Sequence, residues 1–470
     1  MTPKDPLWDV LLEVDFRVLE KDGYEPQVRG GDVVVLAHLH CLPSIVRLFY
    51  ILLTQDLSVP AKQVILIPKP YSTIPSAADE VRKLGINIIR TDSQFRLGRY
   101  DEAVSSHLKE GCRKAHHICC DIVKKGRKPR LVLVDDGGML TETWWRLFHS
   151  SEFEAVSVQQ TASGVRREPK PSKLVKIDVA RSAAKRRFEA KIISEGVLRK
   201  VRDLDIMRGV DRVGVAGIGA LGCALAQSLT ELHKQVHIYD VKQYCCKPDG
   251  AKIATGLGNL LRQSDVLFGC TGRNFLRLGA LEKIKHKLQL VSCSSRDVEF
   301  LDLLRLGKIE KYQSNDPFGP LQVKLGEQTH SIANGGFPIN FDRKEEAETA
   351  EQIVLTRALV LSGIFQALCV KSGRYWKDAL KLSPSIQKAL VLKWLGLTGQ
   401  SAETFVSGGD GAIGDLNWWR ENSFGEEPAS EPVQVRAALG ETETARRASA
   451  LVSERRQRLA SSQIQKLPAL

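Results

Sequence analysis

The chain has 470 residues, enough for two or three domains with substantial cores. Its 43% hydrophobic and 26% charged residues are typical of a globular protein, not of a disordered or membrane-embedded one. The net charge of +13 comes from basic residues spread along the chain, with short runs at 124–130 and 185–187 and no zinc-finger or aromatic RNA-binding motif. A solvated basic surface explains this charge, so a nucleic acid is not the expected partner.

Three features of the sequence indicate the cellular compartment: the N-terminal residues, the apolar stretches and the cysteines. The N-terminal residues lack the apolar segment of a secretory signal. The apolar stretches at 46–53 and 354–370 are shorter than the ~20 residues of a membrane span, or are interrupted by Arg357. The ten cysteines of a chain this long predict no disulfide framework, and without a CxxC spacing they predict neither a zinc site nor a thioredoxin-type redox site. We therefore expect a cytoplasmic protein without a membrane partner.

Strands and helices are predicted to alternate over the first 205 residues. Short β-branched runs predict buried strands at 32–36, 64–67, 86–89, 131–134 and 175–179. Helical periodicity predicts helices over 43–54, up to about Gly85, and over 182–204, and residues 68–75 are predicted to be a loop. This alternation is typical of a parallel sheet, so residues 1–205 are expected to form one α/β domain.

A second α/β series begins at Asp211. Strands are predicted at 213–216, 236–239, 266–268 and 288–291, with a helix over 220–233. We interpret residues 206–343 as a Rossmann-type domain inserted in a second doubly wound α/β domain. Residues 344–398, with a long amphipathic helix over 345–371, are expected to return to the first domain. The polar segment 399–470 is expected to be a poorly ordered tail, with an exposed helix over 433–459.

A glycine-rich turn follows the first strand of the second series and opens a helix, which is the context that a dinucleotide-binding fingerprint requires. Its residues are Gly217, Ile218, Gly219, Ala220, Leu221 and Gly222. In this motif the glycines allow a tight turn, close approach of backbone N–H groups to a pyrophosphate, and tight helix–strand packing. Asp240 stands 18 residues beyond Gly222, near the position of the ribose-binding acid. The turn and Asp240 predict that the chain binds NAD, and NAD more readily than NADP.

Several segments in one order resemble the S-adenosylhomocysteine hydrolase family over residues 30–370. They are Val134-Asp135-Asp136-Gly137-Gly138, Thr161-Ala162-Ser163-Gly164-Val165, Lys185-Arg186-Arg187-Phe188-Glu189, the glycine turn, Cys270-Thr271-Gly272-Arg273, Asp297-Val298-Glu299 and Ile339-Asn340-Phe341. The resemblance implies a substrate domain and an NAD domain that close around the ligand. It also implies oxidation of a ribose 3′-hydroxyl by tightly held NAD, elimination of homocysteine, addition of water, and reduction of the ketone. Self-association is plausible from the same resemblance.

The resemblance assigns roles to particular residues. Lys185 matches a lysine near the 3′-hydroxyl, and Glu189 takes the place of an aspartate; at i, i+4 the two lie on one helix face. Asp136 matches a substrate-binding aspartate and His40 a catalytic histidine. The resemblance places Thr271, Gly272 and Asn340 at the cofactor.

The same comparison exposes departures. Leu42, Gln160, Ala190, Ser194 and Ser295 replace threonine, an acid, asparagine, cysteine and histidine, and the segment 342–345 replaces a glycine–histidine segment. The groups for 3′-oxidation are kept, while those that recognise adenine are mostly changed. Lys185 and Glu189 could equally be an exposed ion pair, His40 a core histidine, and the Asp-Asp-Gly-Gly segment an ordinary turn.

Three functions fit these observations. The first is a divergent NAD-dependent hydrolase-like enzyme acting on a nucleoside or adenosyl-thioether-like substrate. The second is an NAD-binding homologue without hydrolase activity, with a regulatory or binding role. The third is a hydroxy-acid dehydrogenase, which would share the glycine turn without needing the Asp-Asp-Gly-Gly and lysine segments.

Overall fold

The computed structural model places most of the first 400 residues of the chain. The described residues are 16–54, 58–91, 97–151, 153–167, 174–242, 248–306, 308–312, 318–325, 327–371, 379–399, 416, 418 and 419. The first of two compact units, residues 1–424, contains both sheets of the fold. The helix expected over 433–459 lies outside the described residues.

The first sheet has seven parallel strands in the order β15-β6-β5-β4-β1-β2-β3. Their bounds are β1 Val33–Leu39, β2 Val64–Pro68, β3 Asn87–Ile88, β4 Arg130–Asp135, β5 Glu154–Gln159, β6 Val175–Asp178 and β15 Leu380–Lys381. Every residue of β1, β2 and β4 is buried, because helices cover both faces of the sheet. The strands run outward from β1 in two directions, which defines a doubly wound sheet.

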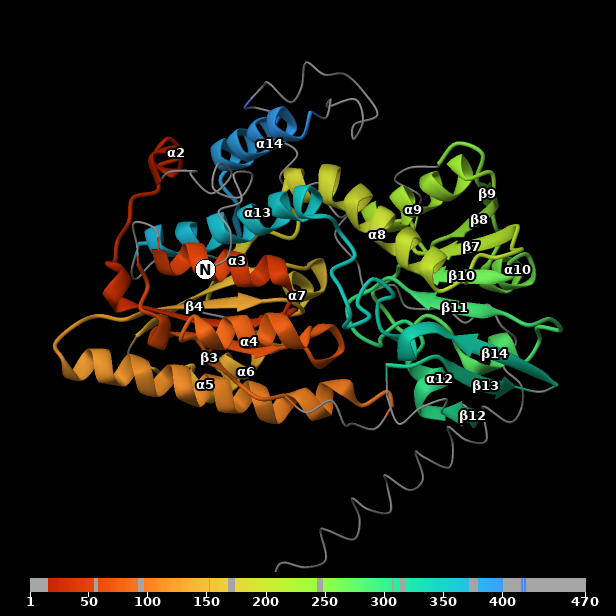
Figure 1. Cartoon of the computed structure of the whole chain (residues 1–470), viewed down its shortest axis with the longest axis horizontal. Helices are drawn as coiled ribbons and strands as arrows, with labels where there is room; N and C mark the ends of the chain where they lie inside the picture. Colours follow the sequence, from red (N-terminus) through yellow and green to blue (C-terminus); the bar gives the residue numbers. More distant parts are fainter. Residues whose placement is uncertain are drawn as a thin grey trace, which may run out of the picture. The chain divides into compact units, whose positions relative to one another are not determined.

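Two helical layers cover this sheet (Figure 1). The layer formed by α3 (Pro43–Thr54), α4 (Pro75–Lys83) and α13 (Ala350–Cys369) packs on side chains such as Val35, and α14 (Pro384–Thr398) packs on the side of α13 that faces away from the sheet. The opposite layer, α5 (Tyr100–Lys124) and α6 (Met139–Phe148), packs on the alternate side chains, such as Leu36. Alternating side chains of each strand therefore serve two cores. The short helices α2 (Phe16–Glu20) and α7 (Ala162–Arg166) complete this part.

The second sheet has eight strands in the order β12-β13-β14-β11-β10-β7-β8-β9. Their bounds are β7 Arg212–Ala216, β8 Gln235–Tyr239, β9 Lys252–Ile253, β10 Val266–Gly269, β11 Gln289–Ser292, β12 Lys308–Tyr312, β13 Leu321–Leu325 and β14 Gln328–Ile332. From β9 to β14 the parallel strands follow the Rossmann order 3-2-1-4-5-6, and β13 and β12 extend the sheet antiparallel. The predicted fold class is confirmed.

Helices also cover both faces of the second sheet. The helices α8 (Ala190–Asp203) and α9 (Ala220–Glu231) pack on one face. The other face carries α10 (Leu257–Arg262), α11 (Leu278–Leu281) and α12 (Leu301–Leu306). After β14 the chain passes through a 3-10 turn, Ala333–Gly336, and returns to the first sheet as α13.

The returning helix α13 differs from the expected amphipathic helix. It begins at Ala350, since Thr349 and Gln352 form a capping box there, and residues 353–369 are all buried. The helix is apolar all round because α3, α14 and the sheet enclose it. It is long and apolar enough to cross a membrane, but 94% of its apolar window is buried inside the protein, as in a core helix.

Several elements depart from the sequence-based expectations. Strand β5 and the 25-residue helix α5 were not predicted, although α5 has an apolar stripe that packs on β1 and β2. The long helix expected over 182–204 contains a π-helical turn at Lys185–Glu189. The expected tail from Gly399 contains helical Trp418 and Trp419, and Trp419 is fully buried in the first core. The other residues of the expected tail beyond Gly399, apart from residue 416, lie outside the described residues.

The cysteines also depart in part from expectation. Cys41, Cys112 and Cys119 are buried free thiols in the cores, as small apolar residues would be. Cys223, in the first turn of α9, is disulfide-bonded, whereas the cysteines along the sequence predicted no disulfide framework. Positions along the sequence do not identify such a bond, because a disulfide depends on spatial and not sequential proximity.

Candidate functional site

Each sheet has a switch point, the place where strand order reverses and ligands bind in open α/β sheets. In the first sheet it lies between β1 and β4, which end at Leu39 and Asp135. In the second it lies between β7 and β10, which end at Ala216 and Gly269. The residues that follow these four strands therefore form two candidate crevices, which we call the first and the second crevice.

The glycine turn lies at the second crevice. Gly217 has φ of +91°, and a Cβ added to it would lie 2.7 Å from the backbone nitrogen of Thr271. A Cβ at Gly222 would lie 1.8 Å from the carbonyl oxygen of Gly217. These two positions therefore require glycine, whereas a Cβ at Gly219 would meet no atom within 4 Å. The turn is tight on its inner side and open at its middle, as a cradle for a pyrophosphate must be.

Three more residues predicted for the cofactor, Ala220, Leu221 and Asp240, adjoin this turn. Ala220 and Leu221 are the first residues of α9. The N-terminal backbone N–H groups of this helix therefore lie at the second crevice. Asp240 follows β8, and its carboxylate accepts hydrogen bonds from the backbone N–H groups of Ile218 (2.6 Å) and Lys242 (3.0 Å). A carboxylate at the end of this strand is the type of group that accepts hydrogen bonds from ribose hydroxyls in dinucleotide-binding folds.

A buried carboxylate, Glu299, closes the β10 side of the second crevice. It accepts hydrogen bonds from the Gly272 backbone N–H (2.6 Å), the Thr271 hydroxyl (2.7 Å) and the Ser294 hydroxyl. Burial raises the pKa of Glu299 to about 7, although these hydrogen bonds oppose the rise. The sequence contained this residue in Asp297-Val298-Glu299 but assigned it no role.

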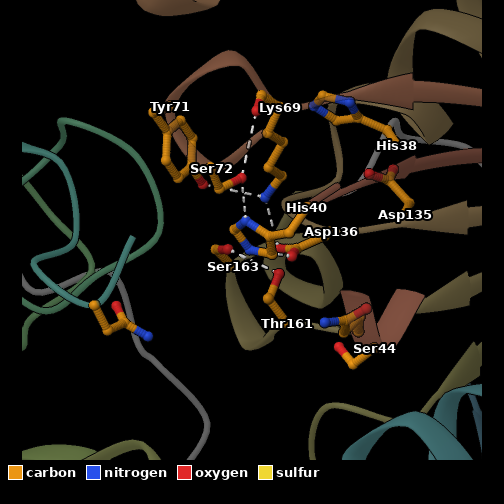
Figure 2. Close-up of polar contacts among 12 residues, drawn as sticks. His38, His40, Ser44, Lys69, Tyr71, Ser72, Asp135, Asp136, Thr161 and Ser163 are labelled. Carbon is orange, nitrogen blue, oxygen red and sulfur yellow. Dashed lines mark hydrogen bonds and ion pairs between the residues drawn. The ribbon is translucent and has the colours of Figure 1, made fainter. Parts of the chain in front are cut away.

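In the first crevice three buried side chains meet, as Figure 2 shows. Asp136, after β4, lies between the other two. Its Oδ1 is 2.9 Å from the Lys69 Nζ atom, and its Oδ2 is 3.0 Å from the His40 Nε2 atom. The structure thus brings together His40 and Asp136, which the sequence predicted, and adds Lys69, which it did not.

The charges of this group are coupled. Burial opposes the ionisation of Asp136, but Lys69 and His40 lower its pKa well below its usual value. Burial also works against the Lys69 ammonium, but Asp136 raises the pKa of Lys69. Burial and the Lys69 charge lower the pKa of His40 to about 4. At neutral pH the group is therefore an ammonium–carboxylate pair beside a neutral imidazole.

Aromatic rings enclose the same group. The His40 ring stacks on Phe341, with centroids 4.0 Å apart, and contacts the edge of Tyr71. Tyr71 in turn stacks on Phe337 at 4.8 Å. Phe337 and Phe341 belong to the segment that returns from the second sheet, so both sheets contribute to the first crevice.

Lys185 and Glu189 form an ion pair beside the end of β5, the strand next to β4. Lys185 is buried; its Nζ atom lies 3.1 Å from a Glu189 carboxylate oxygen and donates to the Gln160 carbonyl oxygen at 2.8 Å. The Gln160 N–H donates to the carbonyl oxygen of Asp135, which connects this pair to the end of β4. The π-helical turn lies between the two charged residues, and such turns are frequent at functional sites. The pair is not an ordinary exposed i, i+4 ion pair.

Asn340, and the residues at several positions where the chain departs from the family pattern, contact groups other than those described above. The Asn340 side-chain amide donates to the buried carboxylate of Glu348 (3.2 Å). Leu42 is buried in the first core, and Ser194 hydrogen-bonds Ser228 between α8 and α9. The segment 342–345 is bonded to α8, because Lys200 pairs with Asp342 and Glu345. Among the described residues, no group of three or more His, Cys, Asp or Glu side chains could hold a metal ion.

Fold and sites together define a two-sheet α/β protein with a Rossmann-type second sheet. No family model matches the chain. It is 28% identical over 347 residues to uncharacterized proteins from two strains of Mycobacterium tuberculosis, an alignment that covers 72% of this chain and 64% of each relative. The chain thus spans just under two thirds of the length of these relatives.

Three solved structures show a weaker likeness. The NAD-complexed D-isomer specific 2-hydroxyacid dehydrogenase of Lactobacillus delbrueckii ssp. bulgaricus is 16% identical, with a TM-score of 0.25, over 56% of this chain and 72% of that one. The NAD-complexed formate dehydrogenase of Staphylococcus aureus is 11% identical, with a TM-score of 0.23, over 39% and 67%. The D-lactate dehydrogenase of Escherichia coli is 13% identical, with a TM-score of 0.25, over 41% and 71%.

Proposed function

We propose that the chain is a divergent, NAD-binding relative of S-adenosylhomocysteine hydrolase that oxidises a hydroxyl group of a nucleoside-like substrate in the cytoplasm. The observation that carries this proposal is the buried Lys185–Glu189 pair, bonded through Gln160 to the strand end that presents Asp136 and His40. A second, separate crevice carries the glycine turn.

The second crevice fits a dinucleotide. The open side of the turn at Gly219, the start of α9 and the Asp240 carboxylate match the pyrophosphate and ribose of NAD. Gly217, Gly222, Thr271 and Gly272 would shape the same wall. Bound NAD would supply a two-electron oxidation of a carbinol carbon.

The chain's own residues would orient the substrate and accept its hydroxyl proton, which can pass by way of Lys185 to the Glu189 carboxylate, 3.1 Å from the Lys185 Nζ atom. Two of the three ammonium protons of Lys185 are used by Glu189 and Gln160, which leaves one for a substrate hydroxyl oxygen. That contact favours the ionised oxygen during oxidation. The free acceptor sites of Asp136 can receive a second hydroxyl of the substrate.

The charge balance supports a neutral substrate over a 2-hydroxy acid. Lys69 and Lys185 each have a carboxylate within 3.1 Å of the Nζ atom. A substrate carboxylate brought beside them would meet Asp136 and Glu189 as well, and like charges repel. A sugar hydroxyl avoids this cost.

The test begins with freshly purified protein, denatured and extracted for bound NAD. Intact protein is then incubated with S-adenosylhomocysteine, adenosine and other nucleosides, and with D-lactate, while absorbance of reduced nicotinamide is recorded. We expect bound NAD that nucleosides reduce and D-lactate does not. Lys185→Met should slow reduction about 10²-fold or more, whereas Lys124→Met on the exposed face of α5 should not. Protein that neither contains nor binds NAD would refute the proposal.

The second candidate is an NAD-binding protein without turnover. It is favoured by Asp136, already paired with Lys69 and His40, and by Phe341, which covers the His40 ring. Bound NAD that stays oxidised with every compound tested would support this candidate over the enzyme.

A further inference from the structure

We infer that Lys69 and Ser72 are positioning residues that fix His40 as a neutral imidazole with its proton on Nε2. Ser72 lies in a short 3-10 turn, Pro70–Ser72, directly after Lys69 and β2. Neither residue was predicted as functional, since the sequence indicated only a loop over 68–75. The inference rests on the proposed function only for the part His40 plays in turnover.

The tautomer follows from the hydrogen-bonding chemistry. An ionised carboxylate can only accept, so the Nε2 atom of His40 must donate to the Oδ2 atom of Asp136 at 3.0 Å. In a neutral ring the Nδ1 atom then accepts, and its partner at 2.6 Å is the Ser72 hydroxyl. The one proton of this hydroxyl has a second acceptor, the Lys69 carbonyl oxygen at 3.3 Å, and the shorter distance favours the bond to His40. Ser72 is fully buried, so water does not compete for this bond. Both ring nitrogens are thereby assigned.

Lys69 keeps Asp136 ionised and His40 neutral. Its ammonium lies 2.9 Å from Asp136 and 3.4 Å from the Tyr71 hydroxyl oxygen, and its side chain is 1% exposed. Protonation of His40 would place a second buried positive charge beside the same carboxylate. Burial and Lys69 lower the pKa of His40 to about 4, while Asp136 opposes this shift.

Other groups around His40 act in the same direction or are neutral. Arg357 of α13 adds a weaker positive field at His40. His38, two residues earlier on β1, donates from Nδ1 to the Ile67 carbonyl oxygen, and burial lowers its pKa to about 3. Tyr71 has a pKa raised by burial, so its phenol is neutral. Lys69 is therefore the main positive charge acting on His40.

The arrangement can be measured by nuclear magnetic resonance on protein with ¹⁵N-labelled histidine. His40→Gln identifies the His40 signals among the ten histidines. We expect wild-type His40 to show a protonated Nε2 and an accepting Nδ1 from neutral pH down to about pH 5. In Lys69→Met the midpoint of its titration should rise by at least one pH unit, and Lys69→Arg should stay within half a unit of wild type.

Ser72→Ala tests the other contact. Loss of the hydroxyl should shift the Nδ1 resonance and mix the tautomers, while the titration midpoint moves less than in Lys69→Met. Should Lys69→Met not fold, the wild-type spectrum and Ser72→Ala still decide the matter. A wild-type His40 that titrates near pH 6.5, or that carries its proton on Nδ1, would overturn the inference. Because the spectra need neither NAD nor substrate, this outcome is independent of the proposed oxidation.

Discussion

At the scale of single residues, the chain combines groups that are costly to bury. Lys69, Asp136 and Lys185 are each at least 95% buried, and each has a partner of opposite charge within 3.1 Å. Breaking such a pair is strongly destabilising, since the remaining charge stays buried. Their burial beside strand ends that bind ligands in this fold class is better explained by a site than by stability alone.

The glycine turn gives a prediction at this scale. Gly222→Ala should lower the melting temperature and weaken NAD binding at least tenfold, because its Cβ would lie 1.8 Å from the Gly217 carbonyl oxygen. Gly219→Ala should leave the melting temperature within about 1 °C of wild type, since its Cβ meets no atom within 4 Å, yet weaken NAD binding by filling the cradle. Thermal unfolding and calorimetric titration with NAD measure both effects. Equal NAD affinity in Gly219→Ala and wild type would argue against the turn as the pyrophosphate site.

At the scale of elements, α13 organises the first sheet. It packs on α3, α14 and three central strands, and Arg130 of β4 caps it by donating to the carbonyl oxygens of Ala367 and Val370. In its third turn, Arg357 pairs with Glu346, which also accepts a hydrogen bond from the backbone N–H of Ser44 of α3. These bonds hold α13 against β4 and α3. They therefore also fix the end of the segment that carries Phe341 and leads into α13.

Substitution of alanine for two glycines in neighbouring helices should change the free energy of unfolding in opposite directions. A Cβ at Gly363 of α13 would lie 2.6 Å from a methyl carbon of Val179 and 2.8 Å from one of Val158. Gly363→Ala should therefore cost about 1–3 kcal/mol of unfolding free energy through overpacking. Gly396→Ala in α14, where the Cβ meets no atom within 4 Å, should instead stabilise by about 0.5–1 kcal/mol. Urea denaturation of both variants measures the difference, and a stabilised Gly363→Ala would contradict the close packing of α13 on the sheet.

At the scale of the whole molecule, stability should depend on pH through Glu299. Burial raises its pKa from 4.5 to about 7 in the folded protein. Between these values the folded state binds more protons than the unfolded state, so the free energy of unfolding falls as pH rises through this interval and levels off above it. The contribution is roughly 3 kcal/mol at most.

Glu299→Gln removes this titration. Relative to wild type, the variant should gain stability between pH 5 and pH 8, because only wild type has the Glu299 proton to lose there. Urea denaturation at both pH values gives the difference, in which the titrations that both proteins share, those of Asp297, Glu348, His38 and His40, cancel. Glu282→Gln at an exposed position of the same domain serves as the control. A difference between Glu299→Gln and wild type that does not change with pH would contradict the buried, protonated carboxyl.

The sequence predicted much of the fold and part of the site. Hydrophobic runs located β1, β2, β4, β7, β8 and β10, because parallel strands covered on both faces are continuously apolar. The same signal failed for β5, where Ser157 and Gln159 are polar but bonded to each other and to Thr141 inside the core. Lys69 was missed because a lysine in a loop is ordinarily solvated. Only the parallel pairing of β2 with β1 brings Lys69, which follows β2, next to Asp136.

By itself the sequence determined the Rossmann-type unit, since the glycine turn is a local constraint: a positive φ at Gly217 and contact with Gly222 leave few alternatives to glycine. It also determined that Lys185 and Glu189 share a helix face. Only the tertiary structure decided that this pair is buried, that Lys69 and Ser72 join His40 and Asp136, and that Phe341 covers them. These features depend on strands and segments far apart in the chain, whose pairing is set by the burial of both sheets as a whole and not by any local pattern.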